Sequence, residues 1–154
     1  MAQGSLFYLD RAVQKIEDGT IKLDGTHTLK AALTTITQPL SRSFLGGSGD
    51  ARYADLTNEL ATANGYTNGG LSLSGVTISR QTTSKSKFTS SSFSWTLSGS
   101  ITFKYVVIFD FSSTNKDLIM VCDMDDSGGS AVALTGTLQF SPDSINGWGY
   151  MEQP

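Results

Sequence analysis

Charged residues are scarce in this 154-residue chain, where Asp, Glu, Lys and Arg make up 16% of the sequence. An average globular domain carries roughly 25%. The 14 acidic and 11 basic residues leave a net charge of −3, and no stretch is rich in Lys or Arg. The chain therefore lacks the basic patch of a nucleic-acid-binding protein, and we expect no nucleic-acid partner. Serine, threonine and glycine take the place of the missing charges, which favours strands joined by short turns.

Long apolar runs are also missing, so no segment approaches the roughly 20 residues of a membrane-spanning helix and no membrane partner is expected. The first ten residues lack the basic and apolar regions of a signal peptide. We therefore expect a protein that is made in the cytoplasm and that can still enter an extracellular particle without a signal.

The chain has one cysteine, Cys122, and one histidine, His27. A single cysteine excludes an intrachain disulfide, and the apolar neighbours of Cys122 predict a buried side chain. His27 lies beside a predicted turn, which indicates an exposed position. No nucleophile elbow, phosphate-binding loop or zinc-protease motif is present. The acidic residues that could form a catalytic pair lie mostly in predicted turns or at strand ends: Asp50, Asp55, Glu59, Asp110 and Asp117. We therefore expect neither an enzyme nor a cofactor.

An acidic turn at 123–129 matches the start of a calcium-binding loop. Oxygen ligands alternate at Asp123, Asp125 and Ser127, and a glycine stands at the sixth position. Leu134 replaces the bidentate acid expected at the twelfth position, and no predicted helices flank the turn. A hairpin turn without metal is the favoured interpretation, and the three oxygen-bearing residues remain a metal candidate.

A β pattern runs through most of the chain. Apolar residues alternate over 93–97, and the run 101–111 is apolar on both faces at mid-length, which places this strand at the centre of a sheet. A turn is predicted at 98–100 between them. Further strands are predicted at 5–9, 28–36, 71–81, 85–88, 118–122 and 131–140. Since strands follow strands without alternating helices, we predict a single mainly β domain over 1–154, an antiparallel β-sandwich or jelly-roll-like fold.

One or two short helices are predicted near the N-terminal side. Asp10 is expected to cap the first, over 11–17. Leu56, Leu60 and Ala61 at helical spacing predict the second. This second helix would lead directly into the glycine-rich segment 64–70.

The segment 64–70, Asn-Gly-Tyr-Thr-Asn-Gly-Gly, cannot continue a helix, because its glycines and asparagines favour positive φ. We call 59–70 the glycine corner. Tyr66 is predicted to anchor it, with a packed ring and a hydroxyl bonded to backbone. Replacing Gly69 or Gly70 with valine is expected to cost several kcal/mol if both hold positive φ.

Three further segments are distinguished within the domain: a possible N-terminal arm at 1–10, of which 5–9 is either a short strand or an apolar arm, a long loop at 38–54 and a C-terminal tail at 141–154. In the loop, the apolar pair Phe44 and Leu45 either packs on the core or contacts a neighbouring subunit. In the tail, Trp148 and Tyr150 are either docked or used in a contact. These four side chains are the interface candidates.

The combination of segments resembles a family of small structural proteins of tailed bacteriophages. In that family a short helix and an LKVAL-like strand, here 29–33, precede a corner of the E-x-x-G-x-G-Y-x-x-G-G type. A tryptophan-bearing strand, here 93–97, and a Tyr-Val-Val-Ile-Phe strand, here 105–109, follow. The resemblance covers most of 8–140. The corner residues that carry it are Glu59, Gly65, Tyr66, Gly69 and Gly70, and Ala63 replaces a frequent glycine.

This resemblance implies a virion protein that acts with copies of itself and with other virion proteins. An accessory protein that decorates or cements the capsid is the favoured hypothesis, because the chain is short for a major capsid protein. A neck, collar or tail protein of the same particle is the alternative. A carbohydrate- or receptor-binding module on a fibre is a hypothesis of another class, with Tyr53, Trp148 and Tyr150 as its candidate contacts.

Overall fold

The computed structural model describes residues 5–80, 85–125, 132–145 and 147–152, and it is mainly β. One α-helix, α1 (Asp10–Glu17), and one 3₁₀ turn (Tyr53–Asp55) accompany the strands. The strands are β1 (Ser5–Tyr8), β2 (Leu29–Thr34), β3 (Leu71–Ser72), β4 (Thr77–Arg80), β5 (Lys85–Thr89), β6 (Phe93–Phe103), β7 (Tyr105–Asp110), β8 (Leu118–Asp123), β9 (Val132–Phe140) and β10 (Gly149–Glu152).

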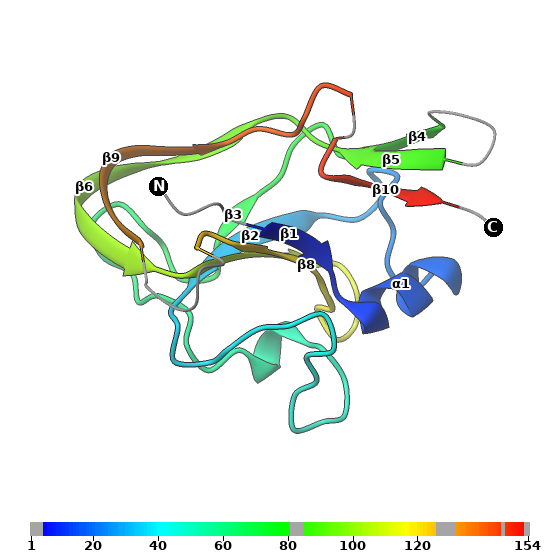
Figure 1. Ribbon diagram of the computed structural model, residues 1–154, viewed down its shortest axis with the longest axis horizontal. Coiled ribbons are helices and arrows are strands. Elements are labelled where there is room, and N and C mark those ends of the chain that lie inside the picture. Colours follow the sequence, from blue (N-terminus) through cyan, green and yellow to red (C-terminus); the bar gives the residue numbers. More distant parts are fainter. Residues whose placement is uncertain (1–4, 81–84, 126–131, 146, 153–154) are drawn as a thin grey trace.

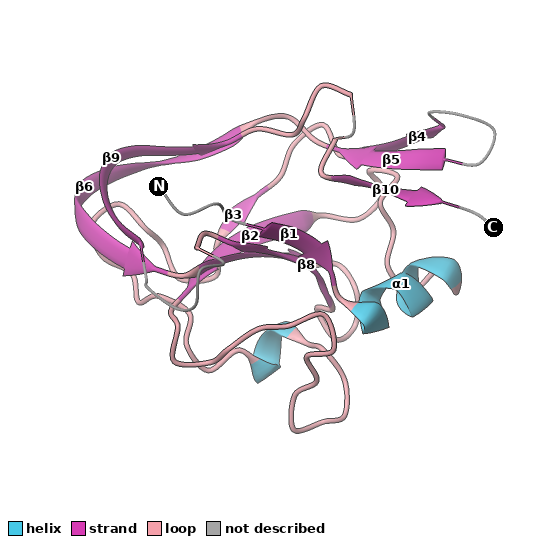
Figure 2. Ribbon diagram, viewed as in Figure 1, coloured by secondary structure: helices cyan, strands magenta, loops and turns pink. Residues whose placement is uncertain are grey.

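The strands form two layers (Figures 1 and 2). One layer is a five-stranded sheet with the order β1-β8-β7-β2-β3. The other holds the two-stranded ribbon β6-β9 and the three-stranded sheet β10-β5-β4. Every pairing between the described strands is antiparallel. The predicted mainly β, antiparallel, sandwich-like architecture is confirmed.

The space between the layers is filled by one hydrophobic core. Alternate residues of β6 point into it, because side chains of a strand alternate between its two faces. Phe93, Trp95 and Leu97 are at most 7% exposed, whereas Ser94 and Thr96 between them are exposed. The alternation seen in the sequence therefore marks the inner and outer faces of the ribbon correctly.

Strand β7 is central in the five-stranded sheet, and all six of its residues are buried, as predicted. The β6-β9 ribbon covers one side of the five-stranded sheet. The long loop before the 3₁₀ turn runs along the opposite side of this sheet, below it in Figure 1. The ring of Tyr53 stacks on Phe109 of β7, with ring centroids 4.4 Å apart. Leu40 and Ala51 of the loop are also buried. The loop therefore supplies the cover that makes β7 a two-sided core strand.

The predicted strand 101–111 is in fact two strands, since β6 ends at Phe103 and β7 starts at Tyr105. The chain crosses between the layers at Lys104, whose buried ammonium lies 2.7 Å from the Asp123 carboxylate and also donates to the Asp125 carbonyl. A buried charge needs such partners, and they lie at the end of β8. The sequence-based prediction was wrong here because apolar periodicity continues on both sides of the lysine.

The predicted turn at 98–100 is also wrong, because β6 continues through it with a register shift against β9. Asn64 of the glycine corner explains the irregularity. Its carbonyl accepts the N–H of Ser98 at 3.0 Å, and its side-chain amide donates to the carbonyl of Ser100 at 2.8 Å. The predicted strand 71–81 likewise divides into β3 and β4, with Gly75 at a φ of +62° between them.

The predicted helix around Leu56–Ala61 is absent, and the segment is extended. The N–H of Leu60 donates to Leu33, and Glu59 forms a bridge with Thr34, so this segment pairs with the end of β2. Tertiary pairing overrides the local helical spacing here. The first helix starts at Asp10 itself, and Leu9 takes the cap position. α1 is eight residues long, and no helix in the described ranges is long and apolar enough to cross a membrane.

Candidate functional site

The carboxylate of Glu59 holds the glycine corner together. Its Oε1 accepts hydrogen bonds from the Tyr66 hydroxyl at 2.6 Å and from the N–H of Gly69 at 2.7 Å, and its Oε2 accepts one from the Tyr53 hydroxyl. The Tyr66 hydroxyl also accepts the N–H of Leu33 at 3.1 Å. Burial and the bond to Glu59 raise the pKa of Tyr66 well above its usual value, so the hydroxyl remains a donor. As predicted, the ring of Tyr66 is buried and its hydroxyl bonds to backbone.

Two glycines of the corner lie in close contact with the backbone of the two layers, Gly70 with the five-stranded sheet and Gly65 with the β6-β9 ribbon. Gly70 has a φ of +67°, and a Cβ there would lie 2.1 Å from the carbonyl oxygen of Ala31 in β2. Gly65 has a φ of +89°, and its Cβ would lie 2.2 Å from the carbonyl oxygen of Thr96 in β6. Gly69 also has positive φ, +94°, but faces open space. The corner is therefore a joint between the five-stranded sheet and the ribbon.

Removing the Tyr66 hydroxyl tests this joint. Tyr66→Phe is expected to lower the free energy of unfolding by about 1–3 kcal/mol, because it leaves the buried N–H of Leu33 without its acceptor. Tyr53→Phe is the matched control, since it removes one hydroxyl bond to Glu59 without orphaning a backbone group. Its expected cost is about 0.5–1.5 kcal/mol. Urea denaturation of both variants measures the difference, and equal costs would contradict the anchor role of Tyr66.

The predicted interface pair in the long loop is divided by the fold. Phe44 is half-buried against the core, whereas the side chain of Leu45 is 53% exposed. Both residues line a hollow of about 410 Å³ beside α1. The other lining residues of this loop hollow are Asp10, Arg11, Gln14, Arg42, Ser43 and Gly49.

The aromatic pair of the tail is placed differently. Trp148 is 8% exposed, its ring lies 5.5 Å from that of Phe93, and its indole N–H donates to the Ser90 hydroxyl at 2.9 Å. The backbone of Tyr150 pairs with Lys87 of β5, and its side chain lies outside the described part. Trp148 also lines a second hollow, the tail hollow, of about 500 Å³. Its other lining residues are Leu6, Phe7, Tyr8, Arg42, Met120, Gly147 and Gly149.

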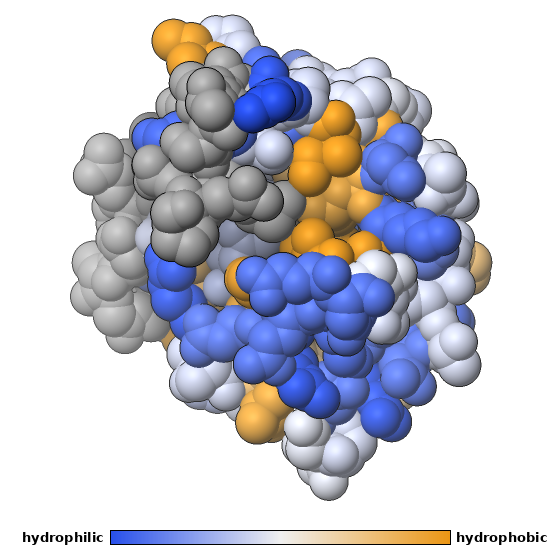
Figure 3. Space-filling model, turned by 90° about the vertical axis from the view of Figure 1, so that its right-hand side faces the viewer, coloured by the Kyte–Doolittle hydropathy of each residue, from blue (hydrophilic) through white to orange (hydrophobic). Residues whose placement is uncertain are grey.

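Arg42 lines both hollows and therefore lies between them. Its guanidinium stands 5.9 Å from the ring centre of Phe7, and its carbonyl accepts the N–H of Asp10 at 2.9 Å. β1, the long loop and the tail thus contribute to one surface. Figure 3 shows the side of the molecule that lies to the right in Figure 1, where apolar residues gather in a recess between hydrophilic ones.

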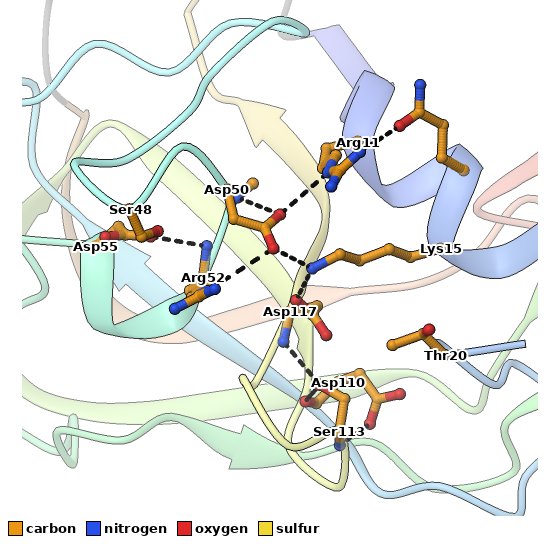
Figure 4. A network of polar contacts seen from close by, with 12 residues as sticks. Arg11, Lys15, Thr20, Ser48, Asp50, Arg52, Asp55, Asp110, Ser113 and Asp117 are labelled. Atoms are coloured by element: carbon orange, nitrogen blue, oxygen red, sulfur yellow. Dashed lines mark hydrogen bonds and ion pairs between the residues drawn. The ribbon is translucent and has the colours of Figure 1, made fainter. Parts of the chain in front are cut away.

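A buried ionic network, which the sequence did not predict, fastens the long loop to α1 (Figure 4). The ammonium of Lys15 lies 2.5 Å from the Asp50 carboxylate and pairs with Asp117 before β8. The three side chains are 10%, 11% and 1% exposed, respectively. Arg11 and Arg52 approach Asp50 at 3.4 Å and 3.7 Å. The network therefore joins three segments that are distant in sequence.

The protonation of this network follows from competing effects. Burial acts to lower the pKa of Lys15, but hydrogen bonds to Asp117 and Asp50 outweigh it, and the pKa is raised. Burial likewise acts to raise the pKa of Asp50, but the bond from Lys15 and the N–H of Ala51 outweigh it, and the pKa is lowered. Lys15 and Asp50 are thus a charged pair at neutral pH. The only sequence signal was Lys15 itself, on the helix face next to Ala12.

His27 is not the exposed turn residue that was predicted. Its side chain is 21% exposed, and its Nδ1 lies 2.6 Å from the buried carboxylate of Asp110 at the end of β7. The other oxygen of Asp110 accepts the N–H groups of Ser112 and Ser113 at 3.0 Å and 3.1 Å. This contact fastens the turn before β2 to the turn after β7.

The metal candidate is only partly within the described residues. Asp123 forms the ion pair with Lys104 and accepts the N–H of Asp125 at 3.0 Å, whereas Ser127 lies outside them. Across the described part of the chain, no group of three or more His, Cys, Asp or Glu is placed to hold a metal ion. Cys122, predicted to be buried, is half-buried, and burial raises the pKa of its thiol to about 11.

Comparisons with family models, with curated proteins and with solved structures yield no match to this chain. The surface around Arg42, the glycine corner and the resemblance to small phage structural proteins are the features that bear on its function.

Proposed function

We propose that this chain is a structural component of a tailed-bacteriophage virion, and that it is an accessory protein that decorates or cements the capsid. The observation that carries the proposal is the placement of the interface candidates. Phe44, Leu45 and Trp148 line two hollows that share Arg42, although about one hundred residues separate the loop from the tail. Leu45 is 53% exposed and Phe44 is half-buried, so the apolar surface of the loop hollow is partly open to solvent. Apolar side chains that line surface hollows mark protein contacts, and particle proteins act through such contacts.

The glycine corner is the second support. The residues that carry the resemblance converge on one carboxylate, because Tyr66 and Gly69 both donate to Glu59. Gly65 and Gly70 fit against the two layers. Together these contacts make the corner rigid. A rigid fold suits a structural protein whose loops and ends must hold fixed positions for contacts with neighbours.

The alternatives differ in what they require of this surface. A neck, collar or tail protein would use the same hollows at another place on the particle. A carbohydrate-binding module would need exposed aromatic rings, yet Tyr53 is stacked on Phe109 and bonded to Glu59, and Trp148 is 8% exposed. The placement of Tyr53 and Trp148 therefore favours the two particle hypotheses over sugar binding, whereas the side chain of Tyr150, the third candidate, lies outside the described part.

Purified virions of the phage that encodes this chain provide the test. Quantitative mass spectrometry is expected to find the chain in a copy number similar to that of the major capsid protein. Leu45→Glu is expected to lower that copy number, because the charge enters the loop hollow. Ile78→Glu, at an exposed apolar residue that lines neither hollow, is the matched control. A few copies per particle would instead favour a neck or tail position, and absence from virions would overturn the proposal.

A further inference from the structure

Strand β9 is the longest open sheet edge in the described part of the chain. It is nine residues long and pairs only with β6 there. The other described edge strands β1, β4 and β10 have four residues each, and β3 has two. An unpaired edge presents free N–H and C=O groups that can pair with a strand of another chain.

The far edge of β6 does not offer the same opportunity, because the glycine corner covers part of it. The N–H of Ser98 and the carbonyl of Ser100 both bond to Asn64, and the N–H of Lys104 donates to Thr34 at 2.8 Å. Within the described residues no backbone hydrogen bond outside the β6 ladder reaches β9. The far edge of β6 is thus covered over 98–104, whereas no such bond to the free edge of β9 is found among the described residues.

Nothing charged protects this open edge. The sequence of β9, VALTGTLQF, contains no Asp, Glu, Lys, Arg or Pro, the residues that usually prevent strand pairing at an edge. By contrast, β4 ends in Arg80 and β10 in Glu152. The pairing of β9 with β6 is regular from Phe140 to Gly136, opposite 93–97, and its register shifts between Leu97 and Ile101. Gly136 has a φ of +85°, and Thr135 and Thr137 lie on either side of it.

We propose that two copies of this chain pair through β9, edge to edge and antiparallel, so that their two ribbons become one four-stranded sheet. A strand-adding partner must itself offer an open edge, and β9 of a second copy is such an edge, which makes a two-fold contact self-complementary. The absence of charge means that the two-fold axis places no like charges opposite each other. The exposed side chains of Thr135 and Thr137 suit cross-strand contacts between hydroxyl-bearing residues.

A paired-lysine variant tests the contact with the full-length chain. Sedimentation equilibrium is expected to show a concentration-dependent dimer for the wild type. Thr135→Lys with Thr137→Lys is expected to raise the dimer dissociation constant about tenfold or more, since like charges then meet across the edge. Ser94→Lys with Thr96→Lys is the matched control, because it adds the same charge to the outer face of β6 and is expected to leave dimerisation unchanged.

A second variant with glutamates at the same two positions distinguishes a chain that no longer pairs from a chain that no longer folds. Thr135→Glu with Thr137→Glu alone is expected to remain monomeric, whereas an equimolar mixture with the lysine variant is expected to form a heterodimer. A monomeric wild type at about 1 mM would overturn the inference. A lysine variant that dimerises like the wild type would overturn it too. The inference goes beyond the virion role: a dimer whose chain is absent from virions would refute only the proposed function.

Discussion

Gly70→Ala is expected to lower the free energy of unfolding by about 2–5 kcal/mol. The left-handed backbone costs a non-glycine residue about 1–2 kcal/mol, and overlap in a packed site adds about 1–3 kcal/mol. At Gly70 both apply, because φ is +67° and the new methyl would lie 2.1 Å from the carbonyl oxygen of Ala31. That oxygen belongs to β2, inside the five-stranded sheet, so it cannot move without disturbing the ladder. Guanidinium denaturation measures the loss.

Gly69→Ala is the control that separates the cost of the left-handed backbone from the cost of steric overlap with β2. Its φ is +94°, but no atom lies within 4 Å of the new methyl. The expected cost is therefore the backbone term alone, about 1–2 kcal/mol. The sequence treats the two glycines alike, and the structure distinguishes them. If both variants cost the same, the corner does not press against β2 as described.

Lys15→Met is expected to cost about 3–5 kcal/mol, because removing one partner of a buried ion pair leaves the remaining charge without compensation. The Asp117 side chain, 1% exposed, loses the ammonium that it pairs with, whereas Asp50 keeps Arg11 and Arg52 nearby. Arg11→Met is the control. The Arg11 side chain is 46% exposed, so its loss is expected to cost less than about 1 kcal/mol. Equal costs would show that burial does not set the importance of these charges.

The cost of Lys15→Met is also expected to depend on pH. The pKa of Asp50 is lowered below its usual 3.8, so the stability it contributes is present above that pH and lost as the pH falls through the folded-state pKa. The pKa of Lys15 is raised above 10.5, so its contribution is present below that pH and lost as the pH rises further. The difference between wild type and variant is therefore expected to be constant from about pH 5 to 9 and to shrink on either side. A difference that does not change down to about pH 2 would contradict the ionic origin.

The residues of the candidate contact surface were recognisable in the sequence, but their arrangement around Arg42 was not. Phe44, Leu45 and Trp148 stand out in the sequence because they are apolar residues in polar segments. Their convergence around Arg42 depends on how the long loop and the tail pack against β1, and no local pattern encodes that. The open edge of β9 was equally hidden, because a strand looks the same in sequence whether or not its second edge is paired.

Local chemistry in the sequence was sufficient to determine the strands with a clear alternation, the buried centre of β7 and the glycine corner with Tyr66 as its anchor. A two-residue period and a positive φ are properties of neighbouring residues, so they can be read along the chain. Only the tertiary structure decided the crossing at Lys104, the extended path of 56–61 and the partners of Lys15. Those partners lie 35 and 102 residues away, and a buried charge takes whichever carboxylate the fold brings to it.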